Sequence, residues 1–236
     1  MSNENAPDPV IDALQGYKTC DISDALLKLK HPHGGFLSGL TMYSPNYQDD
    51  STKIVGRAFT VKYYPRSEEA AVNLEGHYID QVAPGSVVFI SAPQGTVNAL
   101  YGGLMSCRAQ YLGAAGTVVD GRVRDLREHR QLAYPVFARG TSTVSPQEKL
   151  RVGEVNCRVS LQSPEQLDTI ISPGDYLIGD IDGVVCLPQA LAEQVVALMP
   201  SRVAADERIM GALKNGGSFT NASKEHRAGT KSAEDL

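Results

Sequence analysis

The chain has 236 residues, of which 42% are hydrophobic and 21% charged, a balance that indicates a globular protein with a sizeable core and excludes a disordered one. Its 22 basic and 27 acidic residues leave a net charge of -5, which excludes a broadly basic nucleic-acid-binding surface. An anionic ligand must therefore be bound by a local site, and no apolar run approaches the roughly 20 residues that cross a bilayer.

Helical and strand patterns alternate in the N-terminal half. Helical spacing begins near Val10, is broken around 16–19 and resumes over 21–29, where Thr19 or Asp21 is a candidate N-cap. The breaker-rich sequence HPHGGF ends this helix. The next elements expected are a strand over 54–64 with a bulge at Gly56, an amphipathic helix over 68–82 and a buried strand over 87–90.

Shorter elements follow in the C-terminal half. The expected order is a helix with a glycine-rich start over 102–113, a strand over 117–119, a tight turn at Asp120-Gly121 and a short helix over 125–132. Further strands are expected over 136–138, 155–161, 168–171, 176–178 and 183–187. A helix should start at Pro188 and run to about 199, with Pro200 separating it from a second helix that ends near 215.

These elements predict an α/β protein with helices around a mixed β core, because strands dominate the third quarter of the chain and break a strict alternation. Neither an internal repeat nor an internal linker is visible. The ends are poor in apolar residues. We therefore expect a flexible segment over 1–9, one domain over 10–215, and a tail over 216–236 that is flexible or packs on a neighbouring subunit.

Four scattered cysteines form no CxxC pair and have no histidine at metal-ligand spacing. They could form two disulfides, but reduced thiols in an intracellular domain are the favoured interpretation. The N-terminal residues MSNENAPDP also lack the basic-then-apolar pattern of a secretion signal. We therefore expect a cytoplasmic protein with no membrane and no nucleic-acid partner.

The segment GTVVDGRVRDLREHR (116–130) is the most informative in the chain. Arg124 and Asp125 stand side by side after a strand, where loops commonly carry functional sites. A guanidinium suits a planar carboxylate or enolate, and a carboxylate suits a hard divalent cation. Glu128 lies one helical turn further on and could join the same site. The segment therefore points to metal-assisted chemistry on a small oxo-acid.

A simpler interpretation of the same segment stands beside this one. Adjacent opposite charges are frequent on solvated surfaces, and Asp125 could simply cap the next helix. Glu128 could equally pair with Arg124 or Arg127. Spacing alone leaves the two interpretations evenly balanced.

The glycine pair in Tyr101-Gly-Gly-Leu-Met105 is a second candidate. Glycines at a helix start let a ligand approach the backbone amides, and the helix dipole favours an anion there; an ordinary tight turn is the alternative. No nucleotide-binding glycine motif and no GxSxG nucleophile motif is present. The histidines do not cluster at ligand spacing, and Asp180 and Asp182 are interpreted as turn residues.

Four blocks in order resemble the family named after the regulator of ribonuclease E activity (RraA), which includes the 4-hydroxy-4-methyl-2-oxoglutarate aldolases. The blocks are TCDISDAL (19–26), the loop 101–105, 116–125 and SPGDYLIGDIDGVV (172–185), and together they span most of the chain. This resemblance implies a single-domain swivelling β/β/α fold that assembles into homotrimers or hexamers. It also implies a lyase that uses Mg²⁺ or Mn²⁺ and cleaves a carbon–carbon bond next to a pyruvate unit.

The resemblance also implies roles for individual residues. Asp125 corresponds to the metal-ligating aspartate and Arg124 to the arginine that stabilises the pyruvate enolate. The residues that correspond to the loop binding the substrate carboxylate are Gly102, Gly103, Leu104 and Met105. Family aldolases can carry an aspartate where this chain has Gly103, so Glu128 becomes the third catalytic candidate.

The substrate that this resemblance implies is a small 2-oxo-diacid. The expected reactions are cleavage of 4-hydroxy-4-methyl-2-oxoglutarate and decarboxylation of oxaloacetate, because both proceed through the pyruvate enolate. The alternative is a non-catalytic protein that binds and regulates an RNA-processing enzyme, because the family also includes such members.

Overall fold

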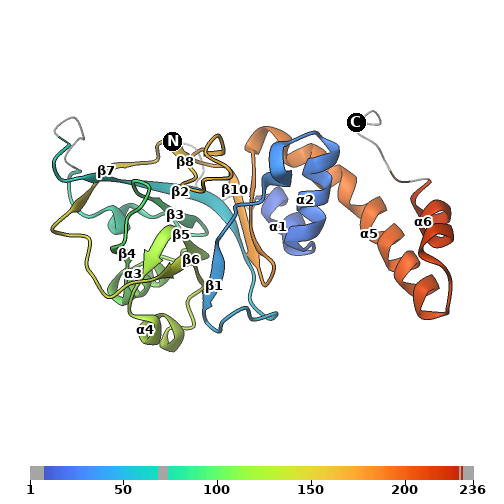
Figure 1. Ribbon diagram of the computed structural model, residues 1–236, viewed down its shortest axis with the longest axis horizontal. Coiled ribbons are helices and arrows are strands. Elements are labelled where there is room, and N and C mark those ends of the chain that lie inside the picture. Colours follow the sequence, from blue (N-terminus) through green and yellow to red (C-terminus); the bar gives the residue numbers. More distant parts are fainter. Residues whose placement is uncertain (1–7, 69–73, 229, 231–236) are drawn as a thin grey trace. The chain divides into compact units, whose positions relative to one another are not determined.

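The computed structural model describes residues 8–68, 74–228 and 230, which fall into two compact units. One unit comprises residues 36–189, and the other comprises the two ends of the chain, up to residue 35 and from residue 190 onward. Both are shown in Figure 1, and each is described by itself.

A mixed sheet of nine strands among the described residues forms the centre of the unit 36–189 (Figure 1). The order along the sheet is β1-β6-β5-β3-β2-β10-β11, with β4 beside β5 and β7 beside β2. The neighbours β6, β5, β3 and β2 run parallel, whereas β1, β7, β10 and β11 pair antiparallel. The bounds are β1 Thr41–Ser44, β2 Ile54–Pro65, β3 Val87–Ser91, β4 Ala99–Tyr101, β5 Gly116–Val123, β6 Val136–Thr141, β7 Leu150–Val155, β10 Tyr176–Asp180 and β11 Gly183–Leu187.

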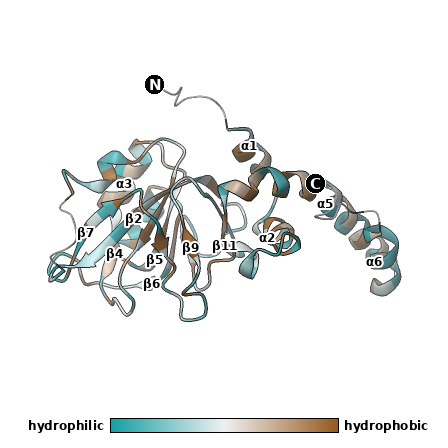
Figure 2. Cartoon of the chain, turned by 90° about the horizontal axis from the view of Figure 1, so that it is seen from above, coloured by the Kyte–Doolittle hydropathy of each residue, from teal (hydrophilic) through white to brown (hydrophobic). Residues whose placement is uncertain are grey.

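Both faces of the central sheet are covered by apolar residues. Successive strand residues point to opposite sides, so neighbours in one strand belong to different core clusters. Val88 and Ile90 of β3 belong to a core cluster on one face, together with residues of the helices that follow β4 and β5. Val87 and Phe89 belong to the second cluster on the other face, with residues of the short β8–β9 pair (Val159–Ser160 and Ile170–Ile171). This two-sided burial explains the apolar run of β3 and the apolar first half of β5, and Figure 2 shows hydrophobic residues in β5.

Two helices and a 3₁₀ turn pack together in this unit: α3 (Gly103–Tyr111), α4 (Leu126–Gln131) and η2 (Tyr78–Gln81). The sequence-based helices over 102–113 and 125–132 are thereby confirmed. The helix expected over 68–82 is wrong in its described part, and residues 69–73 lie outside the described residues. Gly76 has a φ of +74° and His77 is extended, so only the single turn η2 follows.

The tight turn expected at Asp120-Gly121 is also wrong, because β5 continues through both residues to Val123. The Asp120 carboxylate binds Arg139 Nε at 2.6 Å and the Gln162 amide at 2.6 Å, which holds the chain in the sheet. The strand expected over 155–161 is likewise interrupted, because Asn156 adopts a φ of +50° between β7 and β8.

Gly56 is not a bulge and stays in register with Leu177 of β10. A Cβ at this position would lie 2.3 Å from the Gly85 carbonyl oxygen, so the glycine permits close backbone contact. The turn assignment of Asp180 and Asp182 is confirmed, since the Asp182 amide donates to Asp180 Oδ1 at 3.0 Å between β10 and β11. None of the four cysteines, all of which lie among the described residues, forms a disulfide.

The second unit is helical. It contains α1 (Pro9–Gln15), α2 (Thr19–Lys28), the 3₁₀ turn η1 (Pro32–Gly35), α5 (Ala192–Lys214) and α6 (Phe219–Arg227), and the 3₁₀ turn η3 (Gln189–Leu191) leads into it. The N-cap of α2 is Lys18 rather than Thr19 or Asp21, and the Asp21 carboxylate accepts from the Lys18 amide at 2.9 Å. Ion pairs Arg202–Asp24 and Arg227–Asp206 join α5 to α2 and to α6.

The helix break expected at Pro200 is wrong, because α5 runs through this residue. A proline inside a helix removes one backbone hydrogen bond, and here the burial of Leu198 and Met199 before the proline and of Ala205 and Ile209 after it favours continuation. The tail predicted from residue 216 includes the hydrophilic helix α6 (Figure 2), whereas the boundaries at 9 and 215 remain predictions. Within the described part of the chain, no helix is long and apolar enough to cross a membrane.

Candidate active site

Asp125 stands where β5 has ended and α4 begins, in a left-handed conformation with φ 62° and ψ 43°. Aspartate tolerates this conformation better than most residues. Although Asp125 occupies the N-cap position, its carboxylate makes no capping bond to α4. Instead Oδ2 accepts a hydrogen bond of 3.0 Å from the amide of Gly103, at the start of α3. The carboxylate therefore joins two helix starts that lie 22 residues apart in sequence.

Arg124 lies beside this carboxylate, with its Nε 3.6 Å from Asp125 Oδ2. The Arg124 amide donates to the Tyr101 carbonyl at 3.0 Å, which fixes the backbone next to the glycine pair. Both side chains keep about two fifths of their surface exposed, so their mutual attraction adds little stability. The two opposite charges are thus held side by side and remain accessible to a ligand.

Gly102 and Gly103 are required by close contacts rather than by unusual backbone angles. A Cβ on Gly102 would lie 2.5 Å from Asp125 Oδ2, and a Cβ on Gly103 would lie 2.6 Å from Glu128 Cβ. The stem of Glu128 thus occupies the space that a side chain at residue 103 would need. Gly103, Asp125 and Glu128 therefore form one packed group.

The backbone amides of the loop are mostly in use. The Gly103 amide binds Asp125, and the amides of Met105 and Ser106 donate to the Gly102 carbonyl at 3.0 and 3.3 Å. Among the described residues, no acceptor is found for the amide of Leu104, one of the donors that a helix start leaves open. The Gly102 amide likewise has no acceptor among the described residues, so the expected anion-binding loop reduces to the amides of Gly102 and Leu104 and the neighbouring Arg124.

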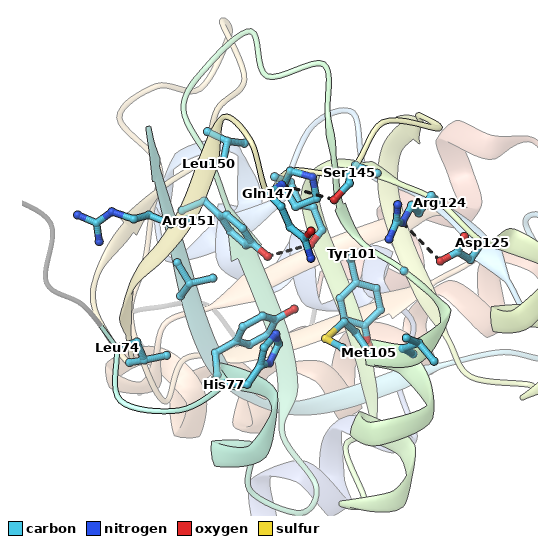
Figure 3. A pocket seen from close by; sticks show the side chains of 18 of the residues that line it. Leu74, His77, Tyr101, Met105, Arg124, Asp125, Ser145, Gln147, Leu150 and Arg151 are labelled. Carbon is cyan, nitrogen blue, oxygen red and sulfur yellow. Dashed lines mark hydrogen bonds and ion pairs between the residues drawn. The ribbon is translucent and has the colours of Figure 1, made fainter. Parts of the chain in front are cut away.

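Figure 3 shows the pocket into which this group opens, which has a volume of about 520 Å³. The predicted residues that line it are Gly102, Leu104, Met105, Arg124 and Asp125. Gly103 and Glu128 do not line its wall. Both contact Asp125, which does: the Gly103 amide donates to its carboxylate and the Glu128 amide donates to its carbonyl. The structure therefore brings the two predicted segments together at one end of a single pocket.

The rest of the pocket comes from segments that the sequence did not single out. Its wall includes Tyr63 and Arg66 from β2 and the loop after it, His77 and Tyr78 around η2, and Leu150 of β7. In Figure 3, His77 and Leu150 lie on the side away from Arg124 and Asp125. No local motif marks these residues. The pairing of β2 with β7 brings Tyr63 and Leu150 together, and η2 reaches the pocket by packing on α3.

A buried histidine supports the site from below. His129 of α4 is 0% exposed; its Nδ1 lies 2.8 Å from Ser106 Oγ of α3, and its ring stacks on Tyr101 at 5.7 Å. Burial lowers the pKa of His129, which favours the neutral ring. This contact ties α3 to α4 behind Gly103 and Asp125, so His129 has a packing role.

The donor chemistry of the site suits a hard divalent cation. No group of three or more His, Cys, Asp or Glu that could hold a metal occurs among the described residues. Mg²⁺, however, binds through one or two carboxylates and otherwise keeps water or substrate oxygens. Asp125, with Oδ1 not engaged by Gly103, could supply such a ligand at the pocket.

Fold and pocket together define an α/β protein with a mixed sheet, flanking helices and a cationic-acidic pair at the edge of a pocket. The Aldolase/RraA family model matches residues 19–186, and the chain belongs to this RraA-like family. A Halalkalibacterium halodurans protein provisionally named 4-hydroxy-4-methyl-2-oxoglutarate aldolase is 33% identical over 72% of this chain and 78% of its own length.

Two solved structures are similar over nearly the whole chain. An uncharacterized protein from Pseudomonas syringae pv. tomato is 30% identical with a TM-score of 0.75, covering 91% of this chain and 96% of that one. A Streptomyces coelicolor structure, described as an unusual member of the RNase ES inhibitor RraA protein family, is 25% identical with a TM-score of 0.70, covering 89% and 98%. The sequence-based family and fold class are thereby confirmed.

Proposed function

We propose that this protein is a divalent-metal-dependent carbon–carbon lyase that works through the enolate of pyruvate, cleaving 4-hydroxy-4-methyl-2-oxoglutarate and decarboxylating oxaloacetate. The observation that supports this most directly is the hydrogen bond from the Gly103 amide to Asp125 Oδ2, which presents a carboxylate beside Arg124 at the pocket. The aldolase names of relatives are consistent with this reaction class.

In the proposed reaction, Asp125 would hold Mg²⁺ or Mn²⁺, which when bound would supply Lewis-acid polarisation of the substrate's 2-oxo group. The Leu104 amide and Arg124 would bind the substrate carboxylate. As the C3–C4 bond breaks, its electron pair forms the enolate, and the Arg124 guanidinium lies where it can stabilise the oxygen that gains charge. Oxaloacetate loses CO₂ at this step, whereas the branched substrate releases a second pyruvate.

Glu128 is the proposed acid–base group. Its stem lies over Gly103, next to Asp125, and its carboxylate is exposed. In the aldol cleavage it would accept the proton of the 4-hydroxyl group as the C4 carbonyl forms, and return a proton to C3 of the enolate. Decarboxylation needs only the second of these transfers, with the proton first taken up by Glu128 from solvent, so the two activities should depend differently on Glu128.

The test is pyruvate release from both substrates, with and without EDTA. Activity should require the added metal and should fall at least about 100-fold in Asp125→Asn. Glu128→Gln should impair cleavage of the branched substrate more than decarboxylation of oxaloacetate. Absence of pyruvate from both substrates, or activity that persists in Asp125→Asn, would refute the proposed reaction.

Regulation of an RNA-processing enzyme is the second candidate, because a relative that covers 89% of this chain is described as belonging to an RNase inhibitor family. A homotrimer or hexamer remains part of the proposal and is measured by light scattering. Recovery of a ribonuclease with the protein, combined with no pyruvate release, would favour the regulatory function. Pyruvate release without such a partner favours the lyase.

A further inference from the structure

The starts of α3 and α4 are joined by two links at successive depths. The outer link is the hydrogen bond of 3.0 Å from the Gly103 amide to Asp125 Oδ2, at the pocket shown in Figure 3. The inner link joins Ser106 Oγ to His129 Nδ1 at 2.8 Å. In each helix the inner residue lies one turn behind the outer residue and on the same face. The two links therefore connect the same pair of helices one above the other.

The two links differ in their access to water. The Asp125 side chain is 38% exposed, whereas Ser106 and His129 are 0% exposed. Water can replace the Gly103 amide as a partner of the Asp125 carboxylate, but it does not reach the inner link. A buried polar group that loses its partner costs more free energy than an exposed one. The separation of the two helix starts is therefore fixed mainly at the inner link.

Ser106 is held from its other side by the side chain of Tyr101. Burial raises the pKa of Tyr101 to about 12, and a hydrogen bond with Ser106 is among the contacts that oppose this rise. The Thr117 hydroxyl of β5 also donates to the Tyr101 hydroxyl, at 3.1 Å. The Tyr101 ring in turn stacks on His129, with ring centres 5.7 Å apart and an angle of 17° between the planes. The inner link is therefore anchored to the central sheet.

Backbone hydrogen bonds connect this buried group to Arg124 and Asp125. The Arg124 amide donates to the Tyr101 carbonyl at 3.0 Å, and the His129 amide donates to the Asp125 carbonyl at 3.2 Å. Asp125 also has a left-handed backbone with a φ of 62°, a conformation that a residue other than glycine keeps only where its surroundings determine it. The buried group supplies such surroundings.

We propose that Ser106 is a positioning residue, because its link to His129 keeps the outer link closed and thereby orients the Asp125 carboxylate. Neither Ser106 nor His129 lines the pocket, so neither would touch a substrate. The value of this orientation to the reaction rests on the proposed function, whereas the coupling of the two links rests on the contacts alone. Loss of the Ser106 hydroxyl should therefore loosen the outer link without removing a reactive group.

Hydrogen exchange of the Gly103 amide, followed by NMR in the full chain, reports directly on the outer link. In Ser106→Ala this amide should exchange at least about tenfold faster, because the outer link opens more often. Ser91→Ala is the matched control: Ser91 is also buried, and its hydroxyl donates to the Ser160 carbonyl at 3.2 Å, outside both helices. That variant should leave the Gly103 rate unchanged.

A second pair of variants separates the hydroxyl from packing. Threonine and valine have nearly the same shape, but only threonine has a hydroxyl, so Ser106→Thr should protect the Gly103 amide better than Ser106→Val. Under the proposed function, Ser106→Ala should also raise the Mg²⁺ concentration for half-maximal pyruvate release by about tenfold, because the metal ligand is less well oriented. Ser91→Ala should not change this concentration.

Three outcomes would overturn the positioning role of Ser106. They are an unchanged Gly103 rate in Ser106→Ala, equal rates in Ser106→Thr and Ser106→Val, and faster exchange with an unchanged Mg²⁺ requirement in an active enzyme. Absence of pyruvate release from the wild type, combined with the expected exchange rates, would refute only the proposed function. The amide measurement needs neither metal nor substrate, which keeps the two failures apart.

Discussion

Gly103 lies directly against the stem of Glu128: a β-carbon on residue 103 would meet Glu128 Cβ at 2.6 Å and Cγ at 3.0 Å. Residue 103 is therefore a glycine in this chain for a local packing reason. The space that a side chain at residue 103 would need is occupied by the stem of Glu128, a carboxylate-bearing residue of the neighbouring helix α4. Gly103 and Glu128 form a complementary pair.

Gly103→Ala should destabilise the fold by about 1–3 kcal/mol, because a methyl group would have to displace the stem of Glu128. Urea unfolding measures this cost. Glu128→Gly removes the atoms in the way, so Gly103→Ala should cost less in that background. Gly211→Ala is the control: a Cβ there meets nothing within 4 Å, so this variant should stabilise α5 by about 0.5–1 kcal/mol. An equal cost of Gly103→Ala in both backgrounds would contradict the packing argument.

Asp125→Asn should separate function from stability. The asparagine oxygen can still accept from the Gly103 amide and tolerates a positive φ, so the free energy of unfolding should change by less than about 1 kcal/mol. Lyase activity should nevertheless fall at least about 100-fold, because the negative charge is lost. Activity and chemical unfolding are measured on the same preparation, and a variant that unfolds readily would show that Asp125 is chiefly structural.

The buried His129 should make stability depend on pH. Burial lowers its pKa below the ordinary 6.5, opposed by its interactions with the Arg124 backbone, Asp125 and Glu128. The unfolded chain therefore binds the proton more readily, so this contribution to stability is present above about pH 6.5 and is lost as the pH falls below it.

Urea unfolding at pH 7.5 and 5.5 tests this dependence. His129→Leu should lose less stability than the wild type between the two pH values, because the titrating group is gone. The variant leaves Ser106 Oγ without its partner, so its stability at pH 7.5 is compared separately. An unchanged pH dependence in His129→Leu would exclude a buried neutral histidine.

Removal of Arg139 should expose the cost of burying Asp120. The Asp120 side chain is 0% exposed, and Arg139 binds it at 2.6 Å, so Arg139→Met should destabilise by about 3–5 kcal/mol. Burial raises the pKa of Asp120 and Arg139 opposes that rise, so without the arginine the loss should be larger at pH 7 than at pH 5. Arg122→Met, at an exposed position, is the control. Urea unfolding of both variants under the same conditions should show a change in the free energy of unfolding of less than about 0.5 kcal/mol for Arg122→Met.

Much of the fold was predictable because it depends on local patterns. The apolar run of β3, the helix starting at the Gly102-Gly103 pair and the strand Gly183–Leu187 follow from burial, chain flexibility and alternation within a few residues. The errors occurred where distant contacts prevailed. Asp120-Gly121 stays in β5 because Arg139 and Gln162 hold its carboxylate, and Pro200 stays inside α5 beside buried neighbours.

The same division applies to the candidate site. The sequence by itself determined the family resemblance, the adjacency of Arg124 and Asp125, and a glycine-rich helix start that could lie near them. Only the tertiary structure decided that Asp125 Oδ2 accepts from Gly103, that Glu128 covers residue 103, and that segments of β2, η2 and β7 complete the pocket wall. Such contacts arise from strand pairing and side-chain packing between segments far apart in the chain, and no local spacing encodes them.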